Sequence, residues 1–189
     1  MSRSLIEESF EPPRVLETEH VRLEPLSTTH NALDHAAVMA SAERLRTRTA
    51  GRWPSVGFEL DENFADLDRH EREHRDGIAF TFTVLDRADG RCLGCVYLRP
   101  ASRLIERATV TEGVLTPEGI TLDYWLVPDA EGLEGELLTA LRSWLTDDWP
   151  FSRVDFTTTE GETAQRRLFE ERLAPSFVAE GEVVVFGFR

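Results

Sequence analysis

The chain has 189 residues, 41% of them hydrophobic and 30% charged, which fits one globular domain with its own core and excludes two full enzymatic domains. Its formal net charge of -14 repels nucleic-acid phosphates and anionic lipid, so we expect neither a nucleic-acid nor a membrane partner for this acidic protein. All 21 basic residues other than histidine are arginine, which excludes a lysine nucleophile or a lysine Schiff base.

The chain ends and the cysteines predict the compartment. No apolar run approaches the roughly 20 residues of a membrane span, and residues 1–14 lack the basic-then-apolar order of a signal peptide. We therefore expect a cytoplasmic protein with an extended arm over residues 1–14 and a single domain over residues 15–189. Cys92 and Cys95 are too few and too close for a disulfide framework, so we expect free thiols.

The first half of the chain predicts a strand, two helices and a hairpin. Residues 21–26 alternate apolar and polar side chains, which is typical of a half-buried strand. Helices are predicted over residues 30–46 and 61–77, and a hairpin over 80–85 and 91–98, with Asp89-Gly90 in its turn. The apolar positions expected to face the core are Leu33, Ala37, Met39 and Ala40 in the first helix, and Leu60, Phe64 and Leu67 around the second.

The second half predicts a strand, a helix, a strand, a helix and two closing strands. Residues 101–118 are irregular or a weak strand, and strands follow over 120–127, 154–158 and, as a pair, 177–188. Helices are predicted over 134–145 and 163–173. This order indicates an α/β (α+β) fold, with a mixed, mostly antiparallel central sheet flanked by about four helices. The apolar stripe of the helix over 134–145 is Leu137, Leu138, Leu141, Trp144 and Leu145.

Three phrases give the chain a family resemblance. They are LETEHVRLEPL over residues 16–26, DYWLVP over 123–128 and TAQRRLF over 163–169. With the element order, they make residues 15–189 resemble the GNAT N-acetyltransferase superfamily, in particular its ribosomal-protein N-terminal acetyltransferase branch (RimJ/RimL type). The resemblance implies an acyl-CoA-dependent N-acetyltransferase with acetyl-CoA as co-substrate. It also implies an acceptor amine on a small molecule or peptide N-terminus, and a homodimer by analogy.

The same resemblance implies a cofactor site. A splayed strand would expose backbone groups near Leu126 and Val127 to the pantetheine arm and thioester. The loop and helix start that follow would hold the pyrophosphate through Gly132, Leu133 and Gly135, because free N–H groups and the helix dipole attract anions. Arg166 and Arg167 lie early in the last helix and have two alternative roles. They either reach CoA phosphates or form ion pairs with glutamates on their own helix.

The chain departs from the family pattern in three places. The family loop reads Arg or Gln, two residues, Gly, one residue, then Gly or Ala, whereas residues 128–136 read PDAEGLEGE, about two residues short and rich in carboxylates that repel phosphate. An asparagine early in the last helix is matched by Glu162, and a proton-donating tyrosine by Phe169. The loop either uses the N–H groups of Gly132 and Gly135 or serves an uncharged acyl donor.

Candidate catalytic residues lie on the strand over 120–127. Asp123 is the candidate base, directly or through a water chain, and Tyr124 the candidate acid. Strand alternation points them to opposite faces, so at most one faces the cleft. Trp53, next to Pro54 in a loop, either lines the acceptor pocket or anchors the loop.

Two further motifs have ordinary explanations. His70 to His74 spells H-E-x-x-H, a zinc-peptidase pattern, but its charged neighbours favour a solvated helix, and we expect no metal. Cys92 and Cys95 spell C-x-x-C on a predicted strand, where a spacing of three sends the thiols to opposite faces and favours core packing. Gly94 between them indicates a bulge or a close backbone approach.

Two functional hypotheses remain. The first is an N-acyltransferase; the second is a catalytically inactive GNAT-fold binding or assembly module. The acidic stretch over residues 129–136 discriminates between them. An opening after Leu126 that receives a thioester favours the first hypothesis, and one filled by protein side chains or walled off by glutamates favours the second.

Overall fold

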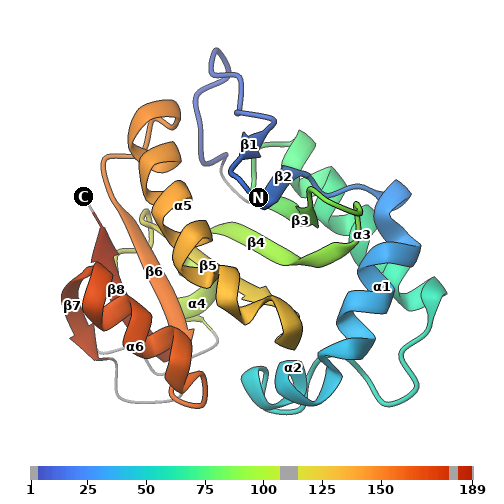
Figure 1. Ribbon diagram of the computed structural model, residues 1–189. Coiled ribbons are helices and arrows are strands. Elements are labelled where there is room, and N and C mark those ends of the chain that lie inside the picture. Colours follow the sequence, from blue (N-terminus) through green and yellow to red (C-terminus); the bar gives the residue numbers. More distant parts are fainter. Residues whose placement is uncertain (1–3, 107–114, 179–182, 189) are drawn as a thin grey trace.

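One eight-stranded sheet organises the protein. The computed structural model describes residues 4–106, 115–178 and 183–188. Its sheet has the order β1-β2-β3-β4-β5-β6-β8-β7 (Figure 1). Every neighbouring pair is antiparallel except β5 and β6, which are parallel. The strands are β1 Leu16–Glu17, β2 Val21–Pro25, β3 Phe80–Asp86, β4 Cys92–Pro100, β5 Ile120–Leu126, β6 Val154–Thr159, β7 Ala174–Val178 and β8 Val183–Phe188. The predicted mixed, mostly antiparallel sheet is confirmed.

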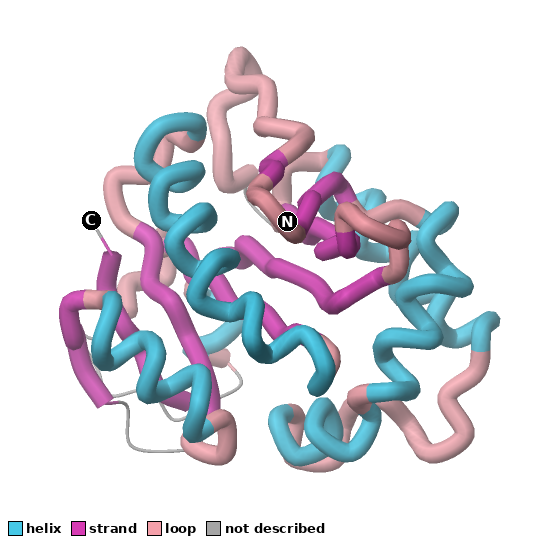
Figure 2. The backbone as a smooth tube through the Cα atoms, in the orientation of Figure 1, coloured by secondary structure: helices cyan, strands magenta, loops and turns pink. Residues whose placement is uncertain are grey.

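Helices cover both faces of this sheet (Figure 2). On one face, Trp144 of α5 packs against Phe82, and Phe169 of α6 packs against Tyr124. On the other face, α1 and α3 contact β4, where the His70 ring lies 5.6 Å from that of Tyr97. The α-helices are α1 Asn31–Ala40, α2 Ala42–Arg48, α3 Leu60–Arg75, α4 Ser102–Ile105, α5 Glu134–Asp148 and α6 Thr163–Arg172; 3-10 turns span η1 Thr28–His30 and η2 Pro128–Leu133.

The helix predicted over residues 30–46 is two helices, and its buried face was predicted wrongly. It breaks at Ser41 between α1 and α2. Leu33 and Met39 are 43% and 42% exposed, and Ala40 is exposed as well, whereas Asp34 and the predicted Ala37 are buried. Asp34 accepts hydrogen bonds from Asn63 Nδ2 at 3.0 Å and Cys95 Sγ at 3.3 Å. A carboxylate with such partners takes a core position that apolar periodicity does not reveal.

The buried stripe of α3 is also largely polar. Leu60 and Phe64, predicted to face the core, are 47% and 50% exposed, while Leu67 is buried as predicted. The other buried members are Asn63 and His70. In α5, by contrast, the whole predicted apolar stripe is buried, because there the inward positions are apolar.

The β3–β4 hairpin contains a bulge that changes the cysteine geometry. Val84 pairs with Gly94 and Leu85 with Cys92, so one extra residue lies between the two pairs. The extra residue puts Cys92 and Cys95 on the same face, so the predicted opposite faces are wrong. Contact with Cys92, together with burial, raises the pKa of the Cys95 thiol well above its usual value. The predicted close approach at Gly94 is confirmed, since a Cβ there would lie 1.9 Å from the Trp125 carbonyl oxygen.

The N-terminal arm lies against the domain. The Leu5 N–H donates to the Gly77 carbonyl at 2.8 Å, and the Phe10 ring lies 6.0 Å from that of Trp149. The stretch predicted as irregular or weak strand contains the short helix α4, and its residues 107–114 lie outside the described residues. Within the described part of the chain, no helix is long and apolar enough to cross a membrane.

Candidate functional site

The two parallel strands part midway along the sheet. Residues Ile120 to Leu122 of β5 pair with Val154 to Phe156 of β6, and the ladder then stops although both strands continue. Buried strands that part leave backbone groups without ladder partners, and such groups must be satisfied by side chains, water or a ligand. β5 and β6 therefore part over residues 123–126, as the resemblance implies for a splayed strand, and we call this parting the opening.

Protein side chains already satisfy the carbonyl groups of this opening. Gln165 Nε2 donates to the Tyr124 carbonyl oxygen at 3.2 Å, and Arg44 Nη1 donates to that of Leu126, also at 3.2 Å. The Val127 N–H donates to the Leu93 carbonyl at 2.7 Å. The backbone groups that the resemblance assigns to the pantetheine arm are thus bonded within the protein.

Arg44 of α2 faces three carboxylates. Its Nε donates to the Glu162 carboxylate at 2.8 and 3.0 Å, and its Nη2 forms a further short contact with the same group. Nη1 donates to Glu131 at 3.0 Å, and Nη2 lies 3.6 Å from Glu134. The Arg44 side chain is 21% exposed, and those of Glu134 and Glu162 are 7% exposed. These contacts hold α2 beside the N-terminal end of α5 (Figure 1).

Arg48 connects the two faces of the opening. Its side chain is 8% exposed, with Nη1 3.3 Å from Gln165 Oε1 and Nη2 3.3 Å from Asp123 Oδ2. Asp123 also accepts a hydrogen bond from Arg99 at 3.2 Å, so two guanidinium groups bracket it. Gln165 is fixed in turn by a 2.7 Å hydrogen bond from Thr158.

Tyr124 points to the other face, as strand alternation predicts. Its ring lies 5.8 Å from that of Phe169, and its buried hydroxyl has no well-formed hydrogen bond among the described residues, with the Gln165 side chain as a polar neighbour. Burial raises the pKa of Tyr124 well above its usual value, and the nearby Glu134 carboxylate adds to this shift. The phenol therefore keeps its proton at neutral pH and can act as an acid but not as a base.

The end of the opening does not fit the diphosphate of CoA. The stretch that would hold it is the 3-10 turn η2 and the first turn of α5, where the half-exposed Glu131 and the buried Glu134 both contact Arg44. Gly132 and Gly135 leave open space where a side chain would stand. Free N–H groups at a helix start attract an anion, but the adjoining carboxylates repel it. No step is therefore assigned to CoA.

Arg166 and Trp53 each have a partner of their own. Arg166 Nε donates to Glu170 at 2.9 Å along α6. The half-buried Trp53 ring packs edge-on against Phe58 at 5.9 Å, and the Trp53 backbone N–H donates to Thr49 Oγ1 at 3.0 Å. These contacts anchor the loop, and the assignment of Arg166 to the cofactor and of Trp53 to the acceptor stays a prediction.

The two histidines of the H-E-x-x-H motif face the sheet, so the predicted solvated setting is wrong for them. His70 is buried, with Nδ1 3.0 Å from Thr81 Oγ1 and Nε2 3.0 Å from an Arg69 nitrogen, and burial lowers its pKa to about 2. His74 packs edge-on against Phe80 at 5.0 Å. Among the described residues, no group of three His, Cys, Asp or Glu is arranged to hold a metal ion.

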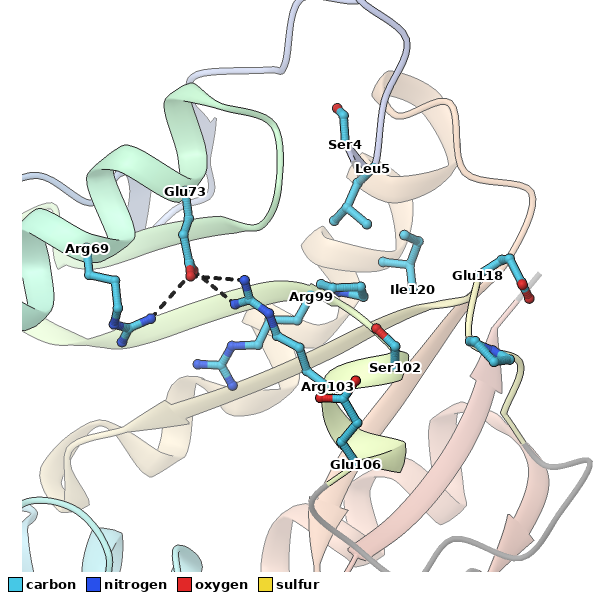
Figure 3. A pocket seen from close by; sticks show the side chains of 12 residues that line it. Ser4, Leu5, Arg69, Glu73, Arg99, Ser102, Arg103, Glu106, Glu118 and Ile120 are labelled. Carbon is cyan, nitrogen blue, oxygen red and sulfur yellow. Dashed lines mark hydrogen bonds and ion pairs between the residues drawn. The ribbon is translucent and has the colours of Figure 1, made fainter. Parts of the chain in front are cut away.

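A cavity of about 770 Å³ lies where β4 ends and β5 begins. Figure 3 shows Glu73 on its wall between Arg69 and Arg103. Glu73 accepts two hydrogen bonds of 2.9 Å from Arg103 and lies 3.5 Å from Arg69. Arg99 also lines the cavity, and its guanidinium connects the cavity wall to Asp123.

Sequence reasoning missed Arg44, Arg48, Gln165 and Arg99. Glu162 and the acidic loop signalled that a cation was needed nearby. Nothing in the sequence indicated which of 21 arginines supplies it.

No protein-family model and no curated protein matches the sequence. Solved structures do match the fold over nearly its full length. A ribosomal-protein-S5-alanine acetyltransferase from Vibrio fischeri is 12% identical, with TM-score 0.65 over 93% of this chain and 96% of its own. A GCN5-related N-acetyltransferase from Brucella melitensis is 19% identical, with TM-score 0.64 over 94% and 79%.

The chain has the GNAT fold. The predicted resemblance to the RimJ/RimL-type branch is confirmed as a likeness of fold. A third GNAT structure, the ribosomal L7/L12 alpha-N-protein acetyltransferase RimL, was solved in complex with coenzyme A. It is 12% identical, with TM-score 0.65 over 92% of this chain and 95% of its own.

Proposed function

We propose that this GNAT-fold protein is an N-acyltransferase that moves an acyl group, acetyl in the first instance, from a thioester to an amine. The observation that carries the proposal is the parting of β5 and β6 beside a buried Tyr124 hydroxyl that lacks a well-formed hydrogen bond among the described residues. The neighbours that share the fold are named as N-acetyltransferases, which supports an amine on a small molecule or a peptide N-terminus as acceptor.

The reaction needs one base and one acid. The amine nitrogen attacks the thioester carbonyl and loses a proton, while the C–S bond breaks and the thiolate gains a proton. We assign the first proton to Asp123, directly or through water, and the proton that the sulfur gains to Tyr124. The proton held by Asp123 then returns through water to the Tyr124 phenolate, so the cycle closes without net proton change. The two residues act from opposite faces of β5, so the thioester has to lie in the opening between them.

The acceptor side is proposed at the cavity beside Arg99. Arg99 lines this cavity and holds Asp123 at 3.2 Å, so an amine that enters there approaches the carboxylate. Arg48 holds Asp123 from the side of the opening at 3.3 Å. Both arginines are positioning residues for Asp123 in this proposal.

The test pairs acyl thioesters with a panel of amines and measures thiol release together with amide formation by mass spectrometry. Tyr124→Phe and Asp123→Asn are each expected to lower kcat by about 10²–10⁴, the range for a lost acid or base. Arg72→Gln, at an exposed position of α3 where Arg72 pairs with Asp68, is the control and should not change kcat. Absence of amide with every pairing, or full activity in both variants, contradicts the proposal.

A second candidate is the non-transferring binding or assembly module. The observation that favours it is the filling of the opening by Arg44, Arg48 and Gln165. If these contacts are permanent, no thioester raises the unfolding temperature at any concentration. If they give way to a donor, a saturable rise in Tm accompanies binding.

A further inference from the structure

We propose that the opening between β5 and β6 rejects the diphosphate end of CoA, and that the acyl donor of this protein is a thioester without a diphosphate. The inference rests on the proposed function and names its donor class. It is carried by the charges at the end of the opening, by the hydrogen bonds that fill it, and by the buried Tyr124 hydroxyl.

The charges around Arg44 are unbalanced toward the negative. Its guanidinium lies within 4 Å of three carboxylates, those of Glu131, Glu134 and Glu162. Arg48 reaches Glu162 only at 3.9 Å and is shared with Asp123. With Arg99, which also contacts Asp123, three cations thus serve four carboxylates, and a diphosphate placed beside them adds like charge to a region already short of cations.

The N-terminal end of α5 offers an anion little further stabilisation. A helix N-terminus favours negative charge over its first turn, but here Glu134 and Glu136 already occupy that turn. Glu136 is bonded to the His20 side chain at 2.8 Å, and Glu134 is buried against Arg44. The dipole is therefore complemented by the protein's own carboxylates.

The inner part of the opening suits an uncharged arm. The Tyr124 and Leu126 carbonyls accept hydrogen bonds from Gln165 and Arg44, and amide N–H groups of a pantetheine-like arm can replace these donors one for one. Arg44 keeps its glutamate partners after such an exchange. The Glu134 carboxylate interacts electrostatically with the buried Tyr124 hydroxyl. In this arrangement the hydroxyl lies beside the sulfur of the thioester, and no phosphate lies next to it.

The first experiment compares two donors that share the thioester and differ in the diphosphate. Acetyl-pantetheine and acetyl-CoA are titrated into the full chain by calorimetry at low salt. We expect acetyl-pantetheine to bind at least as tightly as acetyl-CoA. Acetyl-CoA binding tenfold or more tightly than acetyl-pantetheine overturns the inference and leaves the proposed function standing. No binding of either donor at millimolar concentration overturns both.

The second experiment removes the carboxylates. The variant Glu131→Gln, Glu134→Gln, Glu162→Asn is expected to bind acetyl-CoA at least tenfold more tightly than the wild type, with acetyl-pantetheine affinity changed less than threefold. The control variant Glu8→Gln, Glu11→Gln, Glu59→Gln makes the same charge change at exposed positions. An equal gain in the control assigns the effect to net charge and overturns the inference. Circular dichroism checks that both variants are folded. If either variant does not fold, the comparison of the two donors on the wild-type protein still tests the inference.

Discussion

Arg44 and Glu162 lie 118 positions apart in the chain, and the Arg44 Nε donates to both Glu162 carboxylate oxygens, at 3.0 and 2.8 Å. Glu162 stands where the family pattern has an asparagine, and the same guanidinium also contacts Glu131 and Glu134 of the altered loop. Two departures from the pattern that look independent in the sequence thus share one cation. Charge-assisted hydrogen bonds of this kind are stronger than neutral ones, so the cluster is a structural feature in its own right.

Arg44→Ala is expected to lower the free energy of unfolding by about 2–4 kcal/mol, because it leaves the buried carboxylates of Glu134 and Glu162 without their main cation. Urea unfolding at pH 8 measures the loss. The loss should be smaller at pH 5, where the stranded carboxylates take up protons more readily. The control Arg167→Ala removes an exposed ion pair with Glu171 and should cost under about 1 kcal/mol. A loss no larger than the control would show that the cluster contributes nothing to stability.

Glu134→Gln is expected to make the protein relatively more stable as pH rises. Burial raises the pKa of Glu134 in the folded state, so the folded state binds this proton more tightly than the unfolded state does. Its contribution to stability is therefore present at low pH and is lost as pH rises from its ordinary value of 4.5 through the folded pKa. The difference in unfolding free energy between variant and wild type should grow from pH 4 to pH 8. Glu131→Gln, at a half-exposed position, is the comparison, and an equal trend there would contradict the assignment to Glu134.

His70→Gln is expected to weaken the acid sensitivity of the fold. The folded pKa of His70 is about 2 against 6.5 for the free side chain, because burial disfavours the charged ring. Below pH 6.5 His70 binds a proton in the unfolded state but not in the folded state. The contribution of neutral His70 to the free energy of unfolding is therefore complete above pH 6.5 and is lost as pH falls toward 2. One such proton changes the unfolding free energy by about 1.4 kcal/mol per pH unit. Denaturant titrations from pH 7 to pH 4 should show a shallower slope in the variant, and an unchanged slope would rule out His70 as the source.

Sequence reasoning succeeded where apolar periodicity determines structure and failed where buried polar groups do. The stripe of α5 and the alternation of Asp123 and Tyr124 follow from side-chain hydrophobicity and strand geometry, and both are found. The buried faces of α1 and α3 carry Asp34 and Asn63, whose burial depends on a hydrogen bond formed only in the folded chain. The same limit applies to Arg44, whose partners are distant in sequence and are chosen by the packing of α2.

Gly135→Ala and Gly94→Ala are expected to act in opposite directions, because one glycine has free space and the other has none. Gly135 is the second residue of α5, and no atom lies within 4 Å of an added Cβ, so alanine should stabilise the fold by up to about 1 kcal/mol through helix propensity. Gly94 has a φ of +149°, and its Cβ would meet the Trp125 carbonyl oxygen at 1.9 Å, so alanine there must move β4 away from β5. Thermal unfolding of the two variants measures both effects. If Gly135→Ala also weakens donor binding while raising Tm, the open backbone beside Gly135 contacts the donor. If Gly94→Ala leaves Tm unchanged, the close approach of the two strands does not hold in solution.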